Sequence, residues 1–269
     1  MVDLLKTDLR RILVDKLFIV CCVLGVVFAL FTPFLYALIV LILGEGLDVL
    51  ALFTTSKSLF FTAFNPSGNF GLVVPILIAV VLCKDFSHGT VRNKIICGKK
   101  RRDIFLSMFL SATIVMCALM LLHALMTLTV SLFFFPYGVE FDAGELGYFL
   151  LSLLFSLLLY VLIAAVVSLL CVLMKNTGLT VVLYIALNFL FSIIGTVVSV
   201  AAMLVDAENK FAVRVLEILQ KSNLFITTHI GTGTTYTATD VLCVLIPALG
   251  GTALFLFLGD RFFAKKDLK

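Results

Sequence analysis

The first strong indication of the fold is a charge-free stretch, residues 17–43, which reads LFIVCCVLGVVFALFTPFLYALIVLIL. An α-helix rises 1.5 Å per residue, so the hydrocarbon core of a bilayer, about 30 Å thick, is crossed by roughly 20 apolar residues. This stretch is long enough to cross the core with some tilt. It predicts a transmembrane helix.

The composition of the whole chain agrees with this prediction. Of its 269 residues, 62% are hydrophobic and only 13% are charged, and the mean hydropathy is +1.21. A soluble domain carries about 45–50% apolar and about 25% charged residues. The composition therefore excludes an ordinary soluble enzyme, a disordered chain and a nucleic-acid-binding domain. It predicts a single membrane domain over residues 1–269.

Further apolar runs predict five more spans, at about 66–83, 104–135, 148–174, 179–205 and 241–263. The apolar run Leu59–Phe64 is separated from the second span by a polar interruption, and we expect it to dip into the outer membrane interface. Residues 1–16 have a helical apolar stripe and several charges, which favours an interfacial helix. The alternative is a simple cytosolic start of the first span. The predicted fold class is an all-α integral membrane protein with six transmembrane helices and an N-terminal interfacial helix.

The basic residues predict the orientation, because loops rich in Lys and Arg stay in the cytoplasm. Sixteen of the 20 lie before the first span, in the loop 84–103, in the turn at 175–178 or at the C-terminus. Both termini are therefore expected in the cytoplasm, in a multi-pass protein of the inner (plasma) membrane. The acidic Glu140, Asp142 and Glu145 fall in an outer loop. The basic excess is better explained by orientation and lipid contact than by nucleic-acid binding.

Motifs for chemistry are absent from the sequence. Gly98-Lys99 lacks the remainder of a phosphate-binding loop, and neither H-E-x-x-H nor G-x-S-x-G occurs. Six of the seven cysteines lie in apolar runs and no C-x-x-C is present, so we expect cysteines that pack as small hydrophobes and no metal site. We expect a chain that is not an enzyme and that holds no cofactor.

Two polar residues, His123 and Asn188, fall deep within predicted spans. Ionisable and polar groups at membrane depth often line a substrate or ion path. They also serve simply as buried hydrogen-bonding groups between helices. Both residues are therefore candidates for lining a path, and both interpretations stay open.

The loop 84–103 is longer than a simple connection between two spans needs. Phe86, Val91 and Ile95 are spaced to form an apolar edge, and Gly98 is placed to end a short helix. A short charged helix at the membrane surface would give a contact point for a cytosolic partner. The alternative is an anchor without a partner, held by its positive charge.

This loop resembles the cytoplasmic signature of type-2 ATP-binding-cassette (ABC) transporter permeases, a bacterial family. The signature has an acidic residue and an aromatic, then G-T-x-R-N, and then a glycine followed by basic residues before the third span. The residues that match it in order are Asp85, Phe86, Gly89, Thr90, Arg92, Asn93, Gly98, Lys99 and Arg101 or Arg102. Asp85 departs from the family, where Glu is commoner. The six-span plan and a larger outer segment at 206–240 also resemble this family; its residues Phe211, Val215, Ile218 and Leu219 form a helical apolar stripe.

The resemblance implies a half-transporter that exports an amphipathic peptide, antibiotic or lipid-like substrate. Two permeases, identical or homologous, would face each other, and ATP and Mg would be bound by a separate cytosolic ABC ATPase. The loop 84–103 would be the coupling loop, and its ATPase contacts would be Asp85, Phe86, His88, Gly89, Thr90, Arg92, Asn93 and Lys94. Independently of the resemblance, the outer loop 222–240 is rich in Thr and Gly, chiefly at 227–237, which suits either an outer gate or a flexible return into the last span. An alternative from another class is a non-transporting anchor or sensor that docks a cytosolic partner.

Overall fold

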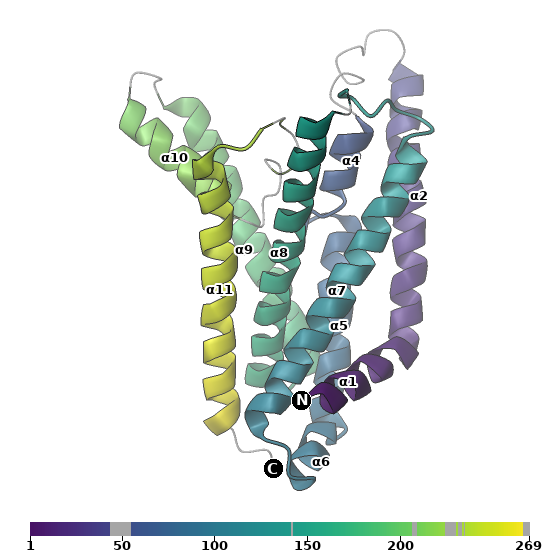
Figure 1. Ribbon diagram of the computed structural model, residues 1–269, viewed down its shortest axis with the longest axis vertical. Coiled ribbons are helices and arrows are strands. Elements are labelled where there is room, and N and C mark those ends of the chain that lie inside the picture. Colours follow the sequence, from purple (N-terminus) through teal and green to yellow (C-terminus); the bar gives the residue numbers. More distant parts are fainter. Residues whose placement is uncertain are drawn as a thin grey trace.

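The computed structural model describes residues 1–43, 55–140, 142–205, 209–223, 230, 233 and 235–265. Within these residues the protein is helical and has no β-strand (Figure 1). Six helices are long and apolar enough to cross a membrane, which confirms the prediction of an all-α membrane protein. They are α2 (Lys16–Leu43), α5 (Asn69–Ser87), α7 (Arg101–Ser131), α8 (Ala143–Met174), α9 (Thr177–Leu204) and α11 (Ala238–Lys265).

The six long helices run roughly along the long axis of the molecule (Figure 1). The apolar stretches of α7 and α8 are mostly buried against other helices, whereas α2, α9 and α11 turn most of their surface outward. The short helix α1 (Val2–Val14) lies obliquely across one end of the bundle, the end at which α11 also finishes. We call this the α1 end. The opposite end holds the short helix α4 (Ser56–Thr62) and is called the α4 end.

Several helix ends differ from the predicted spans by a few residues, for local reasons. Helix α8 begins at Ala143 rather than near 148, because the Asp142 side chain caps it by accepting a hydrogen bond from the Glu145 backbone N–H at 2.7 Å. Helix α7 ends at Ser131, and the apolar residues up to Phe135 continue as turns. Hydropathy detects apolar residues whether or not they are helical, so it extended this span too far.

The apolar run Leu59–Phe64, predicted to dip into the outer membrane interface, packs against other helices of the bundle. Its first residues belong to α4, which packs against α7 and α8 inside the bundle. Phe60 and Phe64 have no exposed surface, and Phe60 stacks on Phe149 of α8 with ring centroids 5.0 Å apart. Helices α4 and α5 are thus two parts of one discontinuous segment, broken at residues 63–68.

The outer segment expected at 206–240 contains helix α10 (Lys210–Ser222), which packs against α9 and α11. Its contact with α9 includes a hydrogen bond from Gln220 Nε2 to Ser199 Oγ of 3.2 Å. The apolar stripe predicted there lies largely on the exposed side, and Phe211 is 80% exposed. Residues 206–208, 224–229, 231–232 and 234 lie outside the described residues, and so does most of the Thr- and Gly-rich stretch 227–237.

Candidate functional site

The predicted coupling loop folds as a turn, a short helix and a second turn at the α1 end. Helix α6 (Thr90–Ile96) is preceded by Gly89 with φ +69° and followed by Gly98 with φ +79°, a backbone region that favours glycine. The Gly98 N–H donates to the Ile95 carbonyl at 2.9 Å, so Gly98 ends the helix as predicted. The buried Val91 holds one face of α6 against the bundle.

The eight predicted contact residues divide into two groups. His88, Arg92 and Asn93 are exposed at the end of the bundle, with Gly89, Thr90 and Lys94 half-buried beside them. Asp85 and Phe86 belong to the last turns of α5 and face inward: Asp85 is only 2% exposed, and the Phe86 ring packs edge-on against Phe263 of α11. These two residues position the loop and offer little surface to a partner.

Helix α1 binds this loop through a buried carboxylate that sequence reasoning missed. Asp8 is 1% exposed; its Oδ1 accepts a hydrogen bond from Lys94 Nζ of α6 at 2.5 Å, and its Oδ2 accepts one from Ser107 Oγ of α7 at 2.6 Å. Hydrogen bonds to a charged group are roughly twice as strong as neutral ones. One side chain of α1 therefore joins α6 to α7.

Two further ion pairs attach α1 to α5. Arg11 pairs with Asp85, and Asp15 accepts hydrogen bonds from Lys84 Nζ at 2.8 and 3.1 Å. Desolvation alone would raise the pKa of Asp15, but hydrogen bonds from Lys84 and from the Leu17 backbone N–H outweigh it and hold this pKa below its usual value. The carboxylate thus stays charged at neutral pH and keeps α1 in place.

The two polar residues predicted at membrane depth both lie beside the break between α4 and α5. Asn188 of α9 donates from Nδ2 to the Pro66 carbonyl at 3.0 Å and accepts at Oδ1 from Ser67 Oγ at 2.8 Å. The Tyr160 hydroxyl of α8 donates to the Phe64 carbonyl at 3.1 Å. Non-helical backbone at membrane depth needs such partners, because lipid offers none.

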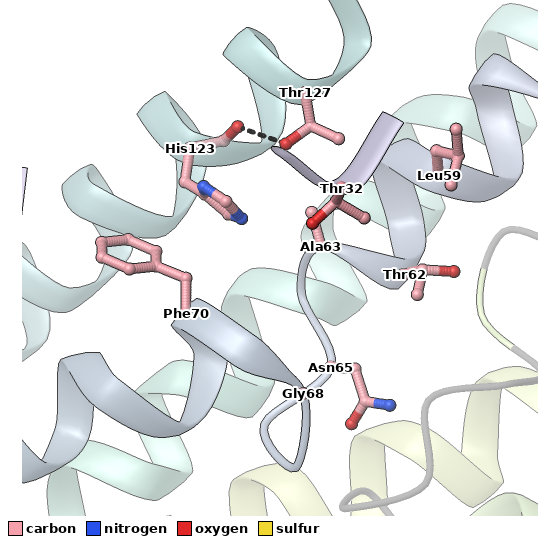
Figure 2. Close-up of a pocket in the computed structure, with 9 residues that line it drawn as sticks. All are labelled: Thr32, Leu59, Thr62, Ala63, Asn65, Gly68, Phe70, His123 and Thr127. Atoms are coloured by element: carbon pink, nitrogen blue, oxygen red, sulfur yellow. Dashed lines mark hydrogen bonds between the residues drawn. The ribbon is translucent and has the colours of Figure 1, made fainter. Parts of the chain in front are cut away.

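His123 of α7 lies on the other side of the break, where it borders a small polar pocket of about 70 Å³ (Figure 2). Its Nδ1 is 3.0 Å from the Gly25 carbonyl of α2, so the neutral ring donates there and turns Nε2 into an acceptor. The pocket has room for a few water molecules. Its polar lining consists of Thr32, Thr62, Asn65, His123 and Thr127.

The structure therefore brings His123 and Asn188 to one feature, the 63–68 break, without bringing them to each other. Both have hydrogen-bonding partners in neighbouring segments, which agrees with the structural interpretation of each. The pocket beside His123 leaves open the interpretation that this residue lines a path for a substrate or an ion. Discontinuous helices commonly mark binding sites in transporters. The break is therefore the polar candidate site within the bundle.

A larger, apolar cavity of about 420 Å³ lies on the other side of the molecule, between α8, α9, α10 and α11. Its lining is mostly apolar, with Val166, Leu187 and Phe255 among its residues, and it also includes Ser222 and Asn223. This volume is in the range of small-molecule sites. An apolar ligand or the apolar part of an amphipathic molecule would fit it.

The described residues contain no group of three or more His, Cys, Asp or Glu side chains arranged to hold a metal ion. The seven cysteines are free thiols, most of them buried among apolar neighbours, and Cys97 is exposed beside α6. No family model matches the chain, and no curated protein matches it either. The structure shows a multi-pass, all-α membrane protein, and its function has to be argued from its sites.

Proposed function

We propose that this chain is the membrane-spanning permease subunit of an ABC exporter, driven by a separate cytosolic ATPase. The observation that carries the proposal is helix α6, which presents Arg92 and Asn93 at the α1 end while its other face is fixed to the bundle. The order of glycine, threonine, arginine and asparagine here is the one that resembles the coupling loop of type-2 ABC permeases. In this proposal the α1 end is cytoplasmic.

The contacts of α6 would let it transmit a movement of the ATPase to the long helices. Lys94 ties it to Asp8 of α1, and Asp8 ties α1 to Ser107 near the start of α7. The guanidinium of Arg101, in the first turn of α7, donates to the Ala264 carbonyl at the end of α11 at 3.0 Å. A push on α6 would therefore reach several long helices as a rigid-body movement.

The proposed substrate is an amphipathic peptide, antibiotic or lipid-like molecule. The apolar cavity between α8 and α11 supports the apolar part of this substrate, because its lining is almost entirely hydrocarbon. The outward apolar faces of α2, α9 and α11 would be covered by lipid and by a second permease, identical or homologous. ATP and Mg would bind in the partner ATPase.

The test is ATPase activity of the reconstituted complex with substitutions on the exposed face of α6. Replacing Arg92 and Asn93 by Ala is expected to lower transport-coupled ATP hydrolysis by about tenfold, the effect of losing about 1.4 kcal/mol of contact. Arg10→Ala is the matched control, because Arg10 is an exposed basic residue on α1 at the same end. It is expected to leave the activity unchanged.

Equal activity of the two variants would contradict a coupling role for α6. If no ATPase associates with the chain in any nucleotide state, the chain is an anchor or sensor that docks another cytosolic partner through the same helix. Membrane insertion of each variant is measured alongside, so that a loss of protein is not mistaken for a loss of coupling.

A further inference from the structure

The α4 end contains a buried lysine. Lys57 lies in the first turn of α4 and is 4% exposed. Lysine is almost never fully buried unless it is paired. Buried ionisable residues in a membrane protein are expensive and often functional.

Three kinds of acceptor surround the Lys57 ammonium. Nζ lies 2.7 and 3.0 Å from the two carboxylate oxygens of Glu145 and 2.9 Å from the Gly233 carbonyl oxygen. It also lies 4.5 Å from the centroid of the Tyr148 ring, a cation–π contact. A primary ammonium has three N–H donors and no acceptor, so this set matches it closely. We call Glu145, Tyr148 and Gly233 the ammonium cage.

The cage is held together by contacts that do not involve Lys57. The Tyr137 hydroxyl donates to Glu145 Oε1 at 3.2 Å, and burial together with the nearby Glu145 charge raises the pKa of Tyr137 to about 12, so it remains a donor. The Gly233 N–H donates to the Tyr148 hydroxyl at 2.9 Å. The Tyr148 ring stacks on Tyr236 with centroids 4.5 Å apart. The acceptors are therefore positioned independently of the cation.

The cation, by contrast, comes from a short separate element. Helix α4 has seven residues and is separated from α5 by the 63–68 break. The polar pocket of Figure 2 lies against its other side, bordered by Leu59, Thr62 and Ala63. A shift of α4 would withdraw Lys57 and leave a carboxylate, a carbonyl and an aromatic face directed at one vacant position.

We propose that the ammonium cage is a binding site for the primary ammonium group of the transported molecule, and that Lys57 occupies it in the unliganded protein. This inference rests on the proposed transport function and narrows the substrate class to amphipathic molecules that carry a primary amine. The exchange replaces one ammonium by another, so Glu145 never remains buried without a counter-ion. A quaternary ammonium has no N–H to offer Glu145 or Gly233, and the cage selects against it.

The first test is chemical rescue of Lys57→Ala in the purified chain. This substitution removes the atoms of propylammonium, which is the probe. We expect propylammonium to raise the thermal unfolding midpoint of the variant by roughly 5 °C when its concentration is about 100 times its dissociation constant. The wild type, whose cage is filled, is expected not to respond beyond the effect of equal NaCl. Tetramethylammonium and 1-propanol are expected to give no rescue of the variant.

The matched control is Lys57→Ala combined with Glu145→Gln, which keeps the shape of the cage and removes its charge. An equal response of the single and double variants, or no response of the single variant, overturns the proposal. The test needs neither an ATPase nor transport. Failure of the permease function and failure of the cage are therefore distinguished by separate measurements.

A second measurement covers the case in which Lys57→Ala does not fold. Ser56, which adjoins Lys57, is fully buried, and its hydroxyl donates to the Phe135 carbonyl at 2.9 Å. In a Ser56→Cys variant, dodecylammonium is expected to speed maleimide labelling at position 56 by about tenfold, as α4 withdraws. Dodecyltrimethylammonium has the same chain without N–H donors and is expected to have no such effect. Equal labelling with the two probes overturns the proposal.

Discussion

The two ends of the bundle use charge in opposite ways. At the α1 end, three ion pairs fasten α1 to α5 and α6, and most of their members are partly exposed. At the α4 end, the pair that fastens α4 itself, Lys57–Glu145, is buried on both sides, whereas Lys221–Asp240 joins α10 to α11 in partly exposed surroundings. The three pairs at the α1 end form one clamp, in which two pairs remain when one is lost. One buried pair leaves an uncompensated charge if either partner is removed.

This difference in ion pairing fits the proposed functions of the two ends, which are ATPase docking at α6 and ammonium binding beside α4. A part that receives force from a soluble partner benefits from several attachments to the bundle, as α6 has through α1. A helix that opens and closes a site, as proposed for α4, benefits from one strong contact, because breaking that contact frees the helix.

Removing Lys57 should give the largest loss of stability. Lys57→Met keeps the apolar stem but leaves the Glu145 carboxylate buried and unpaired, which should cost about 3–5 kcal/mol of unfolding free energy. Adding Glu145→Gln should recover most of this loss. Unfolding in detergent, followed by helical circular dichroism, is the measurement. A single variant as stable as the wild type would remove the contrast between the two ends.

Removing Asp8 tests the contacts that join α1 to both α6 and α7. Asp8→Ala breaks two hydrogen bonds to a buried carboxylate and should cost about 3 kcal/mol. The loss should be accompanied by faster hydrogen exchange in α1 and α6, because Asp8 joins them. Asp3→Ala, on the exposed side of α1, is the control and should change stability by no more than about 0.5 kcal/mol. Unchanged exchange in α6 after loss of Asp8 would show that α1 does not hold it.

The 63–68 break between α4 and α5 depends on the close approach of Gly71 to the Asn65 backbone. A Cβ at Gly71 would lie 2.0 Å from the Asn65 carbonyl oxygen, so Gly71→Ala should cost about 2 kcal/mol through overpacking. At Gly147, in the exposed first turns of α8, a Cβ meets nothing within 4 Å. Gly147→Ala should therefore stabilise the protein by about 0.5–1 kcal/mol. Similar unfolding midpoints for the two variants would contradict this geometry of the break.

Low pH should slightly weaken the attachment to α5 beside α1, because Asp15 becomes protonated. The pKa of this carboxyl is lower in the folded protein than in the unfolded chain, so its contribution is present above the unfolded value, about 3.9, and is lost as pH falls through the lower folded value. The Lys84 partner is 37% exposed, which limits the effect to at most about 1 kcal/mol. Asp15→Asn should flatten the acid limb of the stability profile. An unchanged acid limb would show that the Asp15–Lys84 pair does not contribute.

The long helices could be predicted from the sequence because each is specified by its own residues. A run such as 17–43 has no alternative to crossing a bilayer, and Gly98 stops α6 through its own backbone freedom. The predicted apolar edge was partly right, since Val91 and Ile95 lie on α6 while Phe86 belongs to α5.

The partners within each buried ion pair could not be predicted, because they lie far apart in the chain. Lys57 and Glu145 are 88 residues apart, and Asp8 and Lys94 are 86 apart, so no local pattern connects them. Lys57 also lies in a seven-residue helix that is too short for a hydropathy window, so it read as a loop residue. The positive-inside rule counts charges and does not register which of them are buried.

In the proposed function, α6 docks a cytosolic ATPase. Its most direct test is purification of the tagged chain from native membranes in mild detergent, with quantitative mass spectrometry of the proteins that accompany it. We expect one ABC ATPase per permease chain, lost on replacing Arg92 and Asn93 by Ala and kept on Arg10→Ala. A preparation without any such ATPase, with and without a nonhydrolysable ATP analogue, would contradict it.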